Sequence, residues 1–139
     1  VCLAISFIAS PAADYFSAAG EAIKEMARQT GLFLTDGEGI AKKGTLVRHL
    51  VLPGCGDDTR KVIDFVAEEL GNTVGFSLMR QYTPMFAAKS MPFLNRRLTK
   101  REYERAVEHA VSRGLENAFI QKGGSADAAF TPEFDGSLL

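Results

Sequence analysis

Apolar positions along the chain are arranged in a pattern that predicts alternating strands and helices. Short runs rich in β-branched and aromatic residues predict strands at residues 1–9, 45–52, 73–79 and 118–121. Between these runs, apolar residues recur at spacings of three and four, which is typical of helices that bury one face. Residues that favour the start of a helix are found at Pro11 and Asp14, at Asp57 or Asp58, and at Thr99, and each helical stretch ends at a glycine.

The order of these elements favours a parallel sheet with helices packed outside it. An Asp36-Gly37 turn between two short apolar stretches adds a small β-hairpin before the second strand. The strand-to-helix segments 53–58 and 80–98 are longer than the helix-to-strand turns. In a parallel sheet these longer segments emerge at one end, so we expect the functional site at that end.

Composition places the chain among ordinary globular proteins. It has 139 residues, of which 46% are hydrophobic and 24% charged, which is enough for one domain with a core. The net charge of −1 gives no electrostatic argument for binding nucleic acid or an anionic membrane. The apolar runs are too short to span a bilayer, and two cysteines make no disulfide framework. We therefore expect a cytoplasmic protein.

Six segments carry a family resemblance when they are taken together and in order. They are DYFSAAGEAIKEM from Asp14, GIAKKGTLVRHLVLPG from Gly39, SLMRQYTP from Ser77, LNRRLTKREYERAV from Leu94, GLENAFIQ from Gly114 and FTPEFDG from Phe130. As a set, they resemble radical S-adenosylmethionine proteins that are homologues of pyruvate formate-lyase activating enzyme. The resemblance covers nearly everything after residue 14.

The resemblance implies a fold, two cofactors and a partner. The fold is a partial (βα) barrel, here with about four parallel strands, outer helices and the hairpin insertion. The cofactors are a [4Fe–4S] cluster and S-adenosylmethionine, whose reductive cleavage yields a 5′-deoxyadenosyl radical that abstracts hydrogen. In activating enzymes the substrate is a glycine of a glycyl radical enzyme, so a protein substrate is expected.

The chain departs from the family at the cluster. The superfamily holds its cluster with a CxxxCxxC loop, and Cys2 and Cys55 cannot replace it. The chain also opens inside an apolar run without Met. We interpret residues 1–139 as one domain, the C-terminal half of such a barrel, with an irregular tail at 122–139. No metal or cofactor is expected on this chain alone, and the open sheet edges predict a homodimer or limited solubility.

Two neighbouring residues of the second strand are candidate cofactor contacts. By alternation Arg48 shares a face with Leu46 and Leu50. The resemblance implies that it points inward to the carboxylate of S-adenosylmethionine, and the alternative is an ion pair with a core carboxylate. His49 faces the other side, where a hydrogen-bonded packing histidine is favoured. If the strand twists or bulges, the two residues exchange roles.

Further candidates follow the ends of the strands. Gln81 and Tyr82 lie where the strand 73–79 ends, and they can bind adenine, ribose or substrate, or else anchor the loop. The segment 54–58 is a candidate anion nest, although its two aspartates favour simple helix capping. Cys55 is a candidate reactive thiol because it lies near a helix start. The segment Asn95-Arg96-Arg97 could bind a carboxylate or a partner protein, and the alternative is a solvated loop.

Three functional hypotheses remain open at this point. The first is the cofactor-contact and substrate half of a radical S-adenosylmethionine enzyme. The second is a cluster-less βα module that binds a ligand or a partner without catalysis. The third is a different βα enzyme that uses Arg48 with Asp57 or Asp58 in acid–base chemistry. It ranks last because no pair of carboxylates is placed for it.

Overall fold

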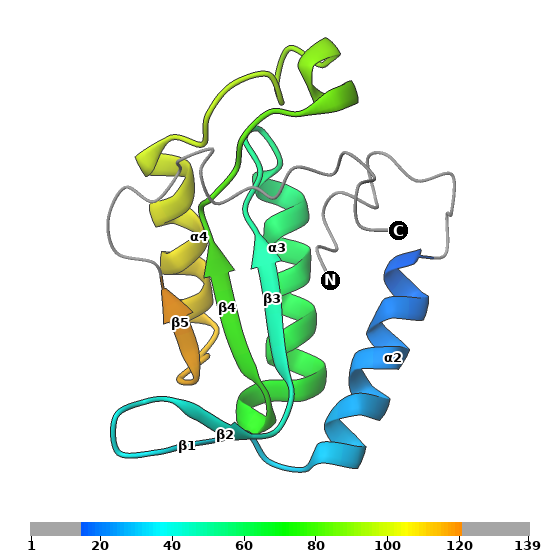
Figure 1. The fold of residues 1–139 in the computed structure, drawn as a ribbon, viewed down its shortest axis with the longest axis vertical. Coiled ribbons are helices and arrows are strands. Elements are labelled where there is room, and N and C mark those ends of the chain that lie inside the picture. The colour runs from blue at the N-terminus through cyan, green and yellow to red at the C-terminus, as the bar shows by residue number, and fades with distance from the viewer. Residues whose placement is uncertain (1–14, 121–139) are drawn as a thin grey trace, which may run out of the picture.

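The computed structural model describes residues 15–120, which form a mixed α/β fold (Figure 1). The strand predicted at 1–9 and the tail at 122–139 lie outside the described residues. The main elements in chain order are α2 (Tyr15–Thr30), β1 (Leu34–Thr35), β2 (Ala41–Lys43), β3 (Leu46–Leu50), α3 (Gly56–Phe65), β4 (Gly75–Met79), α4 (Lys100–Ser112) and β5 (Ala118–Ile120). Short helical turns occupy Val66–Leu70, Gly71–Thr73 and Phe86–Ser90.

The sheet arrangement confirms the α/β prediction at the level of its strands. Strands β3, β4 and β5 form a parallel sheet in that order, and β1 pairs with β2 as a separate antiparallel hairpin. Arg48 aligns with Ser77 of β4, and Ser77 aligns with Phe119 of β5. Residues at one level of a parallel sheet point to the same side, so these three side chains share one face.

One face of the sheet carries the core. Helices α3 and α4 lie side by side behind β3 and β4 in Figure 1. Val47, Phe76 and Leu78 from the strands pack there against Ile63 and Ala110 from the two helices, and all five are buried. This burial of apolar surface holds the strands and helices together.

Helix α2 packs beside α3 rather than on the sheet. The rings of Phe16 and Phe65 meet edge to face, with centroids 5.6 Å apart. A Cβ on Gly20 would lie 3.0 Å from Cζ of Phe65, so the small residue admits this ring. Ile23 is the buried hydrophobic residue of α2. The predicted amphipathic helix is therefore present, with its apolar side toward the end of α3.

Among residues 15–120, Phe33 closes the opposite face of the sheet at one end. The Phe33 ring lies over Gly75, where a Cβ would come within 2.6 Å of its Cζ atom. It also meets Phe119 edge to face, with centroids 5.8 Å apart. Beyond this ring, Leu46 and Arg48 are exposed, and no helix of residues 15–120 packs over them.

The N-termini of α3 and α4 are capped differently. Thr99 and Glu102 form the predicted capping box at the start of α4, with both reciprocal bonds present. The capping role predicted for Asp57 or Asp58 is wrong. The N-cap of α3 is Cys55, which makes no side-chain cap bond, and both aspartates lie inside the first turn. There they interact favourably with the helix dipole instead of closing the helix end.

Within residues 15–120 no helix combines the length and apolar character needed to cross a membrane.

Candidate functional site

Arg48 stands on the open face of the sheet. Its side chain is exposed between Leu46 and Leu50, while Val47 and His49 on either side of it are buried under the helices. The alternation of the strand therefore places Arg48 as predicted. It makes no ion pair or hydrogen bond with any residue of 15–120, so the alternative pairing with a core carboxylate is not formed in that part of the chain.

The surroundings of Arg48 suit an oxyanion. Ser77 lies beside it at the same level of β4 and offers a hydroxyl group. Phe33, Leu46 and Phe119 form an apolar floor on one side. Next to apolar surface a guanidinium group is less screened than in open water, and its planar fork matches the two oxygens of a carboxylate. The arrangement can bind and orient an anionic group.

His49 is separated from Arg48 by the sheet itself. It is fully buried, and its Nε2 lies 3.1 Å from Oγ1 of Thr59 on α3. Within residues 15–120 its Nδ1 atom has no hydrogen-bond partner. Burial lowers the pKa of His49 to about 4, so the ring is neutral near pH 7. A proton on Nε2 that is donated to Thr59 leaves only a bare lone pair on Nδ1, which costs less than an unpaired N–H.

Gln81 and Tyr82 have different environments although they are adjacent. Gln81 is exposed just beyond the end of β4. Tyr82 is buried against Leu52, Cys55 and Leu94, and its hydroxyl donates to the carbonyl oxygen of Leu94 at 3.0 Å. Burial also raises the pKa of the Tyr82 phenol. Tyr82 therefore anchors the 80–98 segment over the β3–α3 turn, and of this pair only Gln81 is presented to solvent.

A network centred on Glu102 was missed by sequence reasoning. Its carboxylate accepts two hydrogen bonds from Arg96, at 2.9 and 2.7 Å, and one from the backbone N–H of Gly54 at 2.9 Å. The Arg96 guanidinium holds the pKa of Glu102 well below its usual range, with the Gly54 and Thr99 bonds acting in the same direction. The carboxylate that Arg96 binds therefore belongs to Glu102 of the same chain. No local sequence motif indicates the contact between Gly54 and Glu102.

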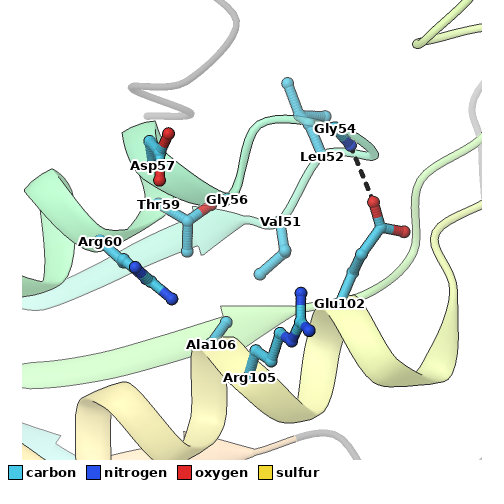
Figure 2. Close-up of a pocket in the computed structure, with 10 residues that line it drawn as sticks. All are labelled: Val51, Leu52, Gly54, Gly56, Asp57, Thr59, Arg60, Glu102, Arg105 and Ala106. Atoms are coloured by element: carbon cyan, nitrogen blue, oxygen red, sulfur yellow. Dashed lines mark hydrogen bonds between the residues drawn. The ribbon is translucent and has the colours of Figure 1, made fainter.

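A cavity of about 290 Å³ lies next to this network, between the first turns of α3 and α4. Figure 2 shows Arg60 from α3 and Arg105 from α4 extending toward the space between the two helices. Buried Val51, Thr59 and Ala106 form its floor. Sequence reasoning did not identify either arginine, because each resembles an ordinary exposed residue of an amphipathic helix.

Cys55 does not behave as a reactive thiol in this fold. Its side chain is buried, and burial raises its pKa, with Asp58 and Glu102 adding to the effect. A raised pKa keeps the thiol protonated and unreactive near pH 7. No group of three His, Cys, Asp or Glu side chains suited to a metal ion occurs within residues 15–120.

Comparison with known proteins gives one informative similarity. An uncharacterized protein of Methanocaldococcus jannaschii is 41% identical to the chain over 78 residues. The aligned part is 55% of this chain but only 23% of the archaeal protein, so the chain spans less than a quarter of that relative's length. No family model matches the chain, and no solved structure matches it.

Proposed function

We propose that the chain is the cofactor- and substrate-facing half of a radical S-adenosylmethionine barrel that resembles pyruvate formate-lyase activating enzymes. The observation that carries the proposal is Arg48: an arginine without a partner in residues 15–120, on the sheet face that α3 and α4 leave open. In this proposal the open face is the interior of a partial barrel. The six sequence segments that resemble the family support it independently.

The residues of the open face have separate roles in this proposal. Arg48 binds the carboxylate of S-adenosylmethionine, and the Ser77 hydroxyl beside it donates a further hydrogen bond. Gln81 contacts adenine, ribose or substrate at the exposed end of β4. Tyr82 is a positioning residue that holds the 80–98 segment. The chemistry that the cofactor supplies when bound is hydrogen-atom abstraction after its reductive cleavage.

The cluster does not fit this chain. Three thiolates are needed to hold a [4Fe–4S] cluster with one open iron, and the sequence contains only Cys2 and Cys55. Cys55 is also buried among apolar side chains. The proposal therefore assigns the cluster to another segment of a longer parent protein. The greater length of the archaeal relative is compatible with such a segment.

The test begins with the reading frame that encodes the chain. A CxxxCxxC motif upstream of residue 1 is expected, and its absence would overturn the proposal. The protein encoded by that frame, reconstituted anaerobically with iron and sulfide, should form 5′-deoxyadenosine from S-adenosylmethionine under reducing conditions. Arg48→Ala should weaken cofactor binding about tenfold or more, and Arg48→Lys should recover part of it. Arg101→Ala, an exposed arginine on α4, is the matched control.

The edge strands and exposed face of the sheet also affect whether the chain associates with itself. In the described sheet β3 and β5 are edge strands, and Leu46 is 40% exposed on the open face. Edges and apolar faces of this kind favour association. We propose that the 139-residue chain alone dimerises or has limited solubility. Sedimentation that shows a clean monomer at high concentration would contradict this.

A second candidate is a ligand-binding or interaction module without catalysis. The observation that favours it is the same shortage of cysteine ligands. The two candidates differ in the reconstitution experiment, because a module without catalysis forms no 5′-deoxyadenosine even when the complete reading frame is used. It can still show Arg48-dependent binding of an anion on the open face.

A further inference from the structure

The cavity between α3 and α4 is separate from the open face on which Arg48 stands. The buried residues of its floor come from the helix side of the fold, and Thr59 in that floor contacts His49, which lies on the opposite side of β3 from Arg48. At about 290 Å³ it is at the lower end of the range for small-molecule pockets. Because the cavity is separate from the open face, the role proposed for Arg48 does not explain the polar side chains that line it.

Two arginines that have no partner within residues 15–120 line this cavity. Arg60 and Arg105 come from different helices, and Figure 2 shows both side chains extending toward the gap between them. Within residues 15–120 neither forms an ion pair or a side-chain hydrogen bond. Arg28, Arg96 and Arg113 in the same part of the chain all pair with carboxylates. Two converging cations in a concave space repel each other unless an anion lies between them.

The N-terminus of α3 adds hydrogen-bond donors on the same side of the cavity. Gly56 and Asp57 of its first turn line the cavity, and the N-cap Cys55 provides no side-chain acceptor for the first amides. Uncapped first-turn amides favour an anion through hydrogen bonding and the helix dipole. The helix end is thus the third feature, after the cavity and the two arginines, that favours negative charge there.

The two carboxylates of the cavity wall do not cancel this preference. Glu102 is already bonded to Arg96, Thr99 and Gly54. Asp57 is exposed and forms no ion pair with Arg60 or Arg105. Asp57 weakens anion binding without occupying either arginine, which makes it useful as a test.

We propose that this cavity is a binding site for a small oxyanion, the carboxylate or phosphate group of a small molecule, held between Arg60 and Arg105. The planar guanidinium groups pair with two oxygens of the ligand, and the first amides of α3 donate to the same group. The apolar floor of Val51 and Ala106 contacts the neighbouring carbon atoms.

The experiment is a titration of the 139-residue chain, followed by amide chemical shifts at constant ionic strength. The probes are inorganic phosphate and malonate, and the stronger binder identifies the class of the oxyanion. Shifts are expected at Gly54, Gly56 and Thr59. Arg60→Gln and Arg105→Gln should each weaken binding about fivefold, and Asp57→Asn should strengthen it.

The control is Arg101→Gln, which removes the same charge from α4 outside the cavity. It should leave the affinity unchanged. The proposal is overturned if neither probe shifts the cavity amides, or if Arg101→Gln weakens binding as much as Arg105→Gln does. Unchanged shifts elsewhere in the spectrum establish that each variant is folded, and Arg60→Gln decides the outcome if Arg105→Gln unfolds the chain.

Discussion

The carboxylate of Glu102 accepts a hydrogen bond from the backbone N–H of Gly54 at 2.9 Å, across 48 positions of sequence. The same carboxylate binds Arg96 and caps its own helix through Thr99. One side chain therefore joins the β3–α3 turn, the end of the 80–98 segment and the start of α4. All three segments lie at the carboxyl ends of the strands, next to the cavity that Gly54 and Glu102 line.

Glu102→Gln should destabilise the fold by about 2 kcal/mol, because it removes the charge from several hydrogen bonds at once. Urea unfolding measures the change. Glu104→Gln is the matched control: Glu104 is more exposed than Glu102, and within residues 15–120 it pairs only with Lys100, at 3.5 Å. Its expected cost is under about 0.5 kcal/mol. Equal losses in the two variants would contradict the role of Glu102 as the centre of the network.

Stability should fall on acidification because of His49. Its pKa is lowered to about 4 in the folded state, whereas the unfolded chain takes up the proton near 6.5. The contribution is fully present above pH 6.5 and is lost as the pH falls toward 4, by about 3 kcal/mol in total. Unfolding measured between pH 7 and 4.5 reports mainly this effect, because Glu25 and Glu102, whose unfolded value is 4.5, lose most of their contribution below that range.

His49→Leu should remove most of this pH dependence, whatever its effect on stability at pH 7. Leucine leaves Thr59 without its buried partner but carries no titratable group. A wild-type chain whose unfolding free energy is constant from pH 6.5 to 4.5 would contradict the burial of a neutral histidine.

Gly75→Ala should destabilise the sheet by about 1–3 kcal/mol, since the new Cβ would lie 2.6 Å from Cζ of Phe33 and 2.9 Å from Cδ1 of Leu46. Gly37→Ala is the control, because nothing lies within 4 Å of its Cβ position. A second variant that also carries Phe33→Leu should recover part of the loss in thermal unfolding. Additive losses in the double variant would show that the two residues do not meet.

Tyr82→Phe should loosen the 80–98 segment while the sheet remains folded. The change removes the hydroxyl that donates to the Leu94 carbonyl, at a cost of about 1 kcal/mol. Faster amide exchange within residues 80–98, and unchanged exchange in β3 and β4, is the expected result. If Tyr82 instead contacts a ligand directly, the same variant weakens binding without changing exchange in the free protein.

Local signals in the sequence were sufficient for several features of the fold. The alternation of β3 places Arg48 and His49 on opposite faces, the Asp36-Gly37 turn predicts the hairpin, and the capping box predicts the start of α4. Each depends on residues within a few positions of one another, where backbone geometry leaves little choice. The predicted cap at Asp57 or Asp58 is wrong because α3 begins at Gly56, which places the N-cap at Cys55, two residues before Asp57.

The sequence by itself thus determined the order of strands and helices, the side of the sheet on which Arg48 stands, and the presence of only two cysteines. Only the tertiary structure decided that Arg96 binds Glu102, that Phe33 covers Gly75, and that Arg60 and Arg105 share a cavity. The physical reason is that these contacts are not local in sequence. These contacts join different elements, so they exist only after α3 and α4 have packed on the sheet and the hairpin has folded beneath it.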